Sequence, residues 1–219
     1  MFTNFQPDVI DISHYDEVSS FNEAYDSGVK GCIIKCTQGL NVIDPLYHDY
    51  VTRAVTTKLL VGSYHFGTDN DGTQQAQFFL QHAQKGTLAM IDYESYPKSQ
   101  MTVNQLEYFL AYFSENQGFL PLLYSGSQIL EDEANSLIGS NSIIRDCNFI
   151  MARYGNEEPN IIEVSDKSNG LVLWQFTGDG VGPEPHNIAG ITSNNVDCSE
   201  WMGGALTNLP VFWKNHLIK

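Results

Sequence analysis

The sequence predicts an α/β protein, specifically a TIM-like β/α barrel with eight strands and about five helices. Short apolar runs alternate with polar segments of helical length, and eight such runs occur within 219 residues. The runs are almost continuously apolar, which is typical of parallel strands covered by helices. With 42% hydrophobic residues the chain can bury one sizeable core. We therefore expect residues 1–219 to form a single barrel domain, with residues 203–219 as a C-terminal extension.

The eight runs give the predicted strands. The last run is weaker than the others because it contains more polar residues. In chain order they are DVIDIS (8–13), GCIIKC (31–36), LLVGSYHF (59–66), LAMIDYE (88–94), PLLYS (121–125), NFIMARY (148–154), LVLWQFT (171–177) and GITSNNVD (190–197).

Helix start and stop signals lie between the first strands. A capping Asp or Thr opens several of these segments, and a Gly closes most of them. After residue 140 the connections become rich in Gly, Pro, Asn and Asp, which predicts loops. The helical segments are 17–28, 44–58, 71–86, 102–118 and the shorter 127–139, and the loop-like ones are 155–170 and 178–190.

Reactive or polar residues stand at the ends of several predicted strands. In a β/α barrel the functional site is built from the carboxyl ends of the strands. Polar residues can also simply mark where strands meet loops. That explanation is weaker for all of them together, because several acidic groups would then lie at one rim with few basic groups to compensate their charge. The residues are Asp11, Ser13, Tyr64, His65, Asp92, Glu94, Tyr124, Gln175 and Asp197.

Asp92 and Glu94 are the strongest of these signals. Residues two apart on a strand share a face and lie about 6.6 Å apart along the chain. The pair therefore predicts two neighbouring carboxyls, one of which can keep its proton because the other repels negative charge. A structural role for Asp92, held by backbone donors, is the alternative.

Composition excludes several partners. Asp and Glu number 26 against 11 Lys and Arg, a net charge of −15, so we expect no nucleic-acid partner and no binding to anionic membranes. The chain has no apolar stretch of membrane-spanning length, and we expect no signal peptide in its opening residues. The four cysteines have no metal spacing and Cys32 and Cys36 are too far apart on one strand to pair, which predicts free buried thiols.

Seven short motifs are spread over most of the chain. They are DIS (11–13), IIKCTQG (33–39), GSYHF (62–66), IDYE (91–94), LYS (123–125), LWQFT (173–177) and NVD (195–197). These motifs occur in the order found in glycoside hydrolase family 25, and the chain resembles this family from Asp11 to Asp197. The family comprises lysozymes of the Chalaropsis type from bacteria, fungi and bacteriophage endolysins.

The resemblance implies a glycoside hydrolase, an N-acetylmuramidase that cleaves the β-1,4 bond between N-acetylmuramic acid and N-acetylglucosamine of cell-wall peptidoglycan. The family's general acid corresponds to Glu94, and its other acidic site residues correspond to Asp92, Asp11 and Asp197. Groove-lining residues correspond to Tyr64, Tyr124, Trp174 and Gln175.

The resemblance also implies a monomer that needs no cofactor or metal. It acts on the wall after release from a host as a phage-type endolysin or after secretion by another route. One departure stands near the site, because the family's usual Thr-Glu-Gly is here Thr37, Gln38 and Gly39.

The chemistry agrees with these roles. Glycoside cleavage needs a proton donor for the leaving oxygen and a negative group beside an oxocarbenium-like centre. Glu94 has the longer side chain and lies nearer the strand end, so it is the predicted acid, while Asp92 orients the substrate's 2-acetamido group. His65, flanked by aromatic residues, is predicted to be a hydrogen-bonded core histidine. Lys35 is expected to make a structural pairing, and pairing with a site carboxylate is the alternative.

Two other classes of function remain open. Asp11, Asp92, Glu94 and Asp197 form an all-oxygen set that suits Mg²⁺ in a phosphoesterase, although the chain has few basic residues for a phosphate. A barrel that binds glycan without cutting it is the other class, and Gln38 favours it slightly. Sensitivity to chelators tests the first alternative, and a cell-wall turbidity assay tests the second.

Overall fold

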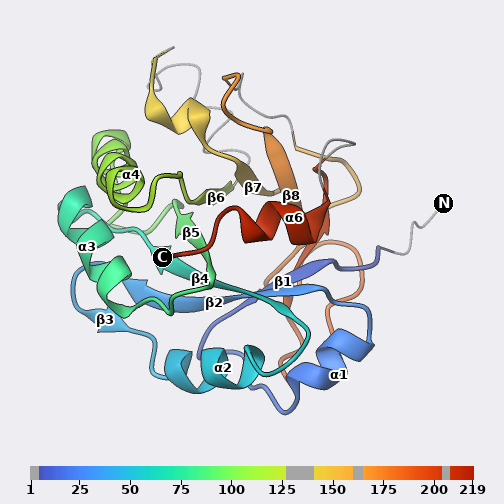
Figure 1. The fold of residues 1–219 in the computed structure, drawn as a ribbon. Coiled ribbons are helices and arrows are strands. Elements are labelled where there is room, and N and C mark those ends of the chain that lie inside the picture. The colour runs from blue at the N-terminus through green and yellow to red at the C-terminus, as the bar shows by residue number, and fades with distance from the viewer. Residues whose placement is uncertain (1–4, 127–140, 160–164, 204–207) are drawn as a thin grey trace.

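The computed structural model describes residues 5–126, 141–159, 165–203 and 208–219 (Figure 1). Its eight long strands close into a barrel, because β1 pairs with both β9 and β2 at the two ends of the strand order. The predicted eight-stranded barrel is confirmed. The strands are β1 (Val9–Ile12), β2 (Gly31–Gln38), β4 (Leu60–Phe66), β5 (Leu88–Asp92), β6 (Leu122–Gly126), β7 (Phe149–Ala152), β8 (Leu171–Thr177) and β9 (Asp197–Trp201). A two-residue strand, β3 (Val42–Ile43), forms a hairpin with the end of β2.

The last strand differs from the prediction. The predicted strand over 190–197 is wrong: the chain there forms loops, and β9 begins only at Asp197. β9 is also antiparallel to both of its neighbours, whereas the other barrel strands run parallel. The start of β9 therefore lies at the same rim as the ends of the parallel strands, which keeps Asp197 at that rim.

Helices cover the outside of the barrel along its first half (Figure 1). Five α-helices lie within the described residues, as does a single turn of 3₁₀-helix, Ile143–Asp146. The predicted helix 127–139 lies outside the described residues, as does part of the predicted loop 155–170. The predicted loop 178–190 is confirmed, because it contains no helix and no strand. The longest helix has a capping box from Thr102 and Gln105 and ends at Gly118, whose φ of 80° suits glycine. The helices are α1 (Phe21–Asp26), α2 (Tyr47–Ala54), α3 (Gly72–His82), α4 (Val103–Gln117) and α6 (Leu209–Lys214).

The core has two layers because strand side chains alternate between the barrel interior and the helix side. Ile33, Met90 and Ile150 belong to the interior cluster. Ile34, Ile91 and Met151, one position later on the same strands, belong to the outer cluster with the aromatic residues of α3 and α4. The alternation determines which polar residues enter the interior at the rim.

Residues 208–219 pack against the amino end of the barrel. Trp213 of α6 is buried and donates a hydrogen bond from Nε1 to the Val61 carbonyl at 3.0 Å. Its ring lies so close to Gly31 and Gly62 that a Cβ at either glycine would be about 3.0 to 3.3 Å from ring atoms. The extension thus contributes to the interior core at the end opposite the rim carboxylates.

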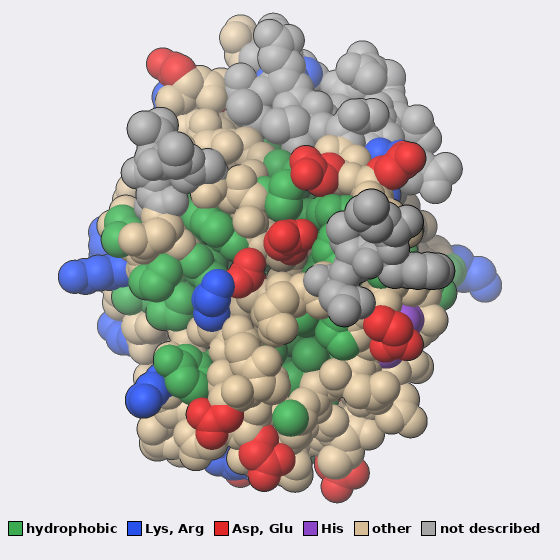
Figure 2. Space-filling model, turned by 90° about the vertical axis from the view of Figure 1, so that its right-hand side faces the viewer, with side chains coloured by type: hydrophobic (Ala, Val, Ile, Leu, Met, Phe, Trp, Pro, Cys, Tyr) green, Lys and Arg blue, Asp and Glu red, His purple; other side chains and the backbone are tan. Residues whose placement is uncertain are grey.

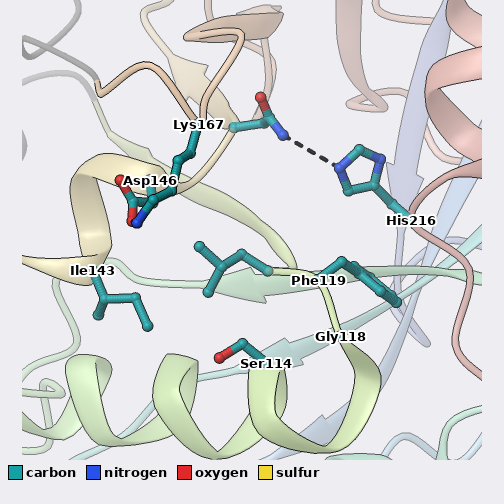
Figure 3. Close-up of a pocket in the computed structure, with 9 residues that line it drawn as sticks. Ser114, Gly118, Phe119, Ile143, Asp146, Lys167 and His216 are labelled. Carbon is teal, nitrogen blue, oxygen red and sulfur yellow. Dashed lines mark hydrogen bonds and ion pairs between the residues drawn. The ribbon is translucent and has the colours of Figure 1, made fainter.

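A cavity of about 480 Å³ lies beside this C-terminal segment (Figure 3). His216 lies on one side of it, 3.3 Å from the side-chain amide of Asn148, and Phe119 packs edge-on against the His216 ring. Asp146 forms an ion pair with Lys167 at 2.8 Å in the same cavity. Since its carboxylate is already paired with a cation, this cavity does not resemble an acid–base site.

Among the described residues, no helix combines the length and the apolar character needed to cross a bilayer. Within the same part of the chain the four cysteines are buried and unpaired, which confirms the expectation of free thiols.

Candidate active site

A cavity of about 220 Å³ opens at the rim where the parallel strands end. It brings together six of the eight predicted site residues, which arrive from β1, β4, β5, β6 and β9 and from the turn after β5. Its lining residues are Asp11, Ser13, Tyr15, Lys35, Tyr64, Phe66, Met90, Asp92, Glu94, Tyr124, Tyr154, Asp179 and Asp197.

Asp92 and Glu94 enter the cavity as their spacing predicts. β5 ends at Asp92, and Tyr93 between the two acids packs into the outer cluster. Asp92 is buried, and its Oδ1 atom has no hydrogen-bond partner in the described structure. An unpartnered buried carboxyl oxygen is costly, so this atom is poised to accept a hydrogen bond from a ligand.

The electrostatics of this pair favour protonation. Burial, followed by the charge of Asp179, raises the pKa of Glu94, and Lys35 opposes that rise. Burial, followed by the charges of Glu94 and Asp11, raises the pKa of Asp92 well above its usual value. A carboxyl with a raised pKa can donate a proton near neutral pH.

Asp11 and Asp197 face each other across the closure between β1 and β9, where they are direct partners in the strand register. Burial is the main cause that raises the pKa of Asp11 to about 7, against a hydrogen bond from Gln175 that lowers it. Burial and then Asp11 raise the pKa of Asp197 to about 9, while the backbone N–H of Asp179 donates to its Oδ1 at 3.2 Å. Both acids therefore hold a proton to higher pH than an exposed aspartate does.

Gln175 and Trp174, the other two predicted site residues, do not line the cavity. Gln175 lies beneath it, where its Nε2 donates to Asp11 Oδ2 and its Oε1 accepts from the Tyr124 hydroxyl, both at 2.9 Å. Trp174, one position earlier on β8, lies on the outer face in contact with Phe5 and Phe176. The strand alternation explains this placement, so Gln175 orients two lining residues and Trp174 belongs to the outer core.

The cavity lining also includes residues that the sequence analysis did not single out, among them Tyr154, Asp179 and Tyr15. Tyr154 follows β7, and the signal that flags Tyr64 and Tyr124, an aromatic residue ending an apolar run, also marks it. Asp179 lies in the loop after β8. Tyr15 follows β1 and is 82% exposed, with its ring 4.0 Å from the ring of His14.

Lys35 and His65 complete the surroundings. Lys35 Nζ donates to Gln38 Oε1 at 2.8 Å, which agrees with the expected structural pairing, and among the described residues no ion pair joins Lys35 to a site carboxylate. His65 is buried between the barrel wall and the helices, and it is hydrogen-bonded to the side chains of Thr37 and Gln75. The prediction of a core histidine is confirmed.

The acidic excess extends over the surface. Figure 2 shows one face of the molecule, on which Asp and Glu side chains lie at the centre and along the lower edge. Together with the net charge of −15, this distribution repels polyanions.

A barrel whose rim gathers carboxyls of raised pKa around a cavity has the arrangement of a glycoside hydrolase. The family model described as Glycosyl hydrolases family 25 matches residues 10–184. Since that match covers most of the sequence, the chain belongs to glycosyl hydrolase family 25, as the motif order predicts.

Known proteins resemble the chain in sequence and in fold. The autolytic lysozyme of Clostridium acetobutylicum is 28% identical over 203 residues, which are 90% of this chain and 56% of that protein, so the chain spans little more than half of it. A bacterial lysozyme structure from Streptomyces coelicolor has a TM-score of 0.77 at 22% identity, covering 94% of this chain and 96% of that one. The muramidase of Trichobolus zukalii has a TM-score of 0.73 at 25% identity, covering 94% and 98%.

Proposed function

We propose that the protein is a peptidoglycan hydrolase, an N-acetylmuramidase that cleaves the β-1,4 bond between N-acetylmuramic acid and N-acetylglucosamine. Glu94 is the general acid and Asp92 assists it. The observation that carries the proposal is the unpartnered Oδ1 of Asp92, buried in the same cavity as Glu94.

The two carboxyls have complementary tasks. Glu94, with its pKa raised by burial and Asp179, protonates the leaving oxygen. Asp92 accepts a hydrogen bond from the N–H of the 2-acetamido group, so that the acetamido oxygen attacks the anomeric carbon. This substrate-assisted route is a recognised exception to the two-carboxylate mechanism.

The remaining lining residues position the sugar. Tyr64 and Tyr124 line the cavity, where aromatic rings can stack on a sugar. Asp11 and Asp197 flank the cavity at the barrel closure. Their charges raise the pKa of Asp92. Gln175 fixes Asp11 and Tyr124 from below.

The names of the relatives support this substrate. The sequence matches include an autolytic lysozyme and an N,O-diacetylmuramidase of Chalaropsis. Bacterial peptidoglycan is therefore the proposed partner, bound by a protein that acts as a monomer.

The phosphoesterase alternative receives less support from the site. Within the described residues, no three His, Cys, Asp or Glu side chains are grouped as metal ligands. Lys35 is the basic side chain among the residues that line the cavity. A phosphate would meet at least five carboxyls there.

Mass spectrometry of fragments released from purified peptidoglycan tests the proposal. We expect fragments that end in reducing muramic acid, in equal yield with and without EDTA. Reducing glucosamine ends would identify a different bond, and activity that EDTA abolishes and Mg²⁺ restores would identify a metal enzyme. Binding to the wall without released fragments would identify a glycan-binding barrel.

A further inference from the structure

Lys35 is a buried cation that the proposed chemistry does not use. Its side chain is 9% exposed and lines the cavity that contains Asp92 and Glu94. Its ammonium group lies 4.7 Å from the centre of the Phe66 ring and donates to the neutral amide oxygen of Gln38 at 2.8 Å.

A bulge in β2 brings Lys35 and Gln38 together. Residues three apart on a regular strand point to opposite faces. The register of β2 against β4 shifts between Lys35 and Thr37, and both Cys36 and Thr37 face the outer layer. Bulges re-aim side chains next to active sites, and this one lets Gln38 turn inward to hold the ammonium.

The partner of Lys35 matters because it carries no charge. A carboxylate in place of the Gln38 amide would cancel the positive charge by forming an ion pair. The amide instead fixes the ammonium group and leaves its charge to act on the buried acids of the cavity, where charges interact more strongly than in bulk water. The other charged groups around Lys35 are acids: Asp11, Asp44, Asp92, Glu94, Asp179 and Asp197. The neighbouring titratable groups are Tyr15, Tyr64, Tyr124 and Tyr154 of the cavity and His65 on the helix side of β4.

We propose that Lys35, held by the neutral side chain of Gln38, is a positioning residue that keeps part of this acidic cavity ionised and thereby sets the pH range of catalysis. The inference rests on the proposed function for its effect on activity. The direction of the effect on pH follows from the neighbouring groups. Burial and the nearby acids raise the pKa values of Asp92 and Glu94, and Lys35 lowers them.

Two variants remove the charge in different ways. Lys35→Met keeps an unbranched side chain but removes the charge, and Gln38→Glu keeps Lys35 and neutralises it with a carboxylate. We expect both limbs of the pH–activity profile to move to higher pH by roughly one unit, the ordinary size of a protein pKa shift. If Lys35→Met does not fold, Gln38→Glu still decides the question.

Matched controls carry the same substitutions elsewhere. Lys85→Met and Gln81→Glu change exposed residues at and just after the end of α3, near the amino end of the barrel. Their profiles should coincide with that of the unmodified protein. Profiles of Lys35→Met and Gln38→Glu that also coincide with it would overturn the proposal.

A second readout does not depend on activity. NMR titration of ¹³C-labelled carboxyl groups, assigned with Asp92→Asn and Glu94→Gln, should show the pKa of Asp92 or Glu94 rising by roughly one unit in Lys35→Met. If the unmodified protein releases no muramic acid ends, the proposed function fails while this titration still tests Lys35. If it releases them and the titrations are unchanged, only the role of Lys35 fails.

Discussion

At the scale of the residue, the surroundings of Asp92 and Glu94 suit the different tasks that we propose for them. Asp92 is buried at the end of β5 with one oxygen unpartnered, whereas Glu94 lies beyond the strand with a longer side chain that reaches the cavity. Depth therefore favours Asp92 as a fixed acceptor and reach favours Glu94 as the proton donor.

Replacing Glu94 tests that division. Glu94→Gln keeps the shape but cannot donate a proton as an acid, so we expect the rate of wall lysis to fall at least about a hundredfold, the usual scale of general acid catalysis. Circular dichroism should show an intact fold. Glu115→Gln, at an exposed position on α4, is the matched control and should retain full activity. Near-normal lysis by Glu94→Gln would remove Glu94 from the role.

The cavity residues show what a sequence can predict about a site. The strand ends place Asp11, Asp92 and Tyr64 at one rim, because the carboxyl ends of parallel strands must meet there. Asp179 could not be placed in this way: it reaches the rim because Gly178 and Val181 exchange backbone hydrogen bonds and turn the loop back over it. Trp174 shows that a position near the end of a strand does not by itself predict a site residue, because every second side chain on a strand points away from the barrel interior.

At the scale of the element, β5 places Asp92 and Glu94 on the same side of the cavity. Two carboxyls on one side are poorly arranged to attack a bond from opposite faces, which favours attack by the substrate's acetamido oxygen. We therefore expect net retention, with the muramic acid product first released as the β-anomer. Proton NMR of the earliest product, before mutarotation, measures this. An initial α-anomer would mean inversion, with Asp92, Asp11 or Asp197 activating water.

The helix α6 closes the amino end of the barrel through Trp213. Trp213→Ala would leave a cavity against Gly31 and Gly62 and lose the hydrogen bond to Val61, so we expect a loss of about 3–5 kcal/mol in the free energy of unfolding. Val211→Ala, on the exposed side of the same helix, should change it by less than about 0.5 kcal/mol. Chemical denaturation compares the two, and equal losses would contradict a structural role for α6.

The helix-poor last third was the part of the fold that the sequence predicted least well. The sequence pattern of residues 190–197 is only weakly typical of a strand. The observed strand β9 begins at Asp197, the last residue of that segment, and continues to Trp201. Its antiparallel direction depends on pairing with β8 and β1, which are distant in sequence. Local patterns carry no information about such pairing, whereas the helices and strands of the first half follow from periodicity and caps.

At the scale of the whole molecule, the buried acids make stability depend on pH. The pKa of Asp197 rises from 3.8 to about 9 on folding, and that of Asp11 from 3.8 to about 7. The folded state therefore holds protons that the unfolded chain releases. This contribution to stability is complete below about pH 4 and is lost as the pH rises toward 7 for Asp11 and toward 9 for Asp197.

We expect the melting temperature to fall between pH 5 and pH 8, as the folded state loses these protons, and to fall less steeply in Asp197→Asn, which has no proton to lose. Calorimetry across this range measures both slopes. Asp26→Asn, an exposed change on α1, should leave the slope as it is. An unchanged slope in Asp197→Asn would show that the acids at the barrel closure do not govern stability.

The direction of β9 also determines how the protein can be attached to a solid support. Because β9 runs away from the carboxyl-lined rim, residues 208–219 lie at the far end of the barrel, where Lys219 donates its backbone N–H to Gln117 at the end of α4. A linker fused after Lys219 would anchor the molecule with its cavity facing the solution. Beads prepared in this way should clear a suspension of cell walls, whereas beads coupled through a cysteine placed at Tyr15, on the lining of the cavity, should not.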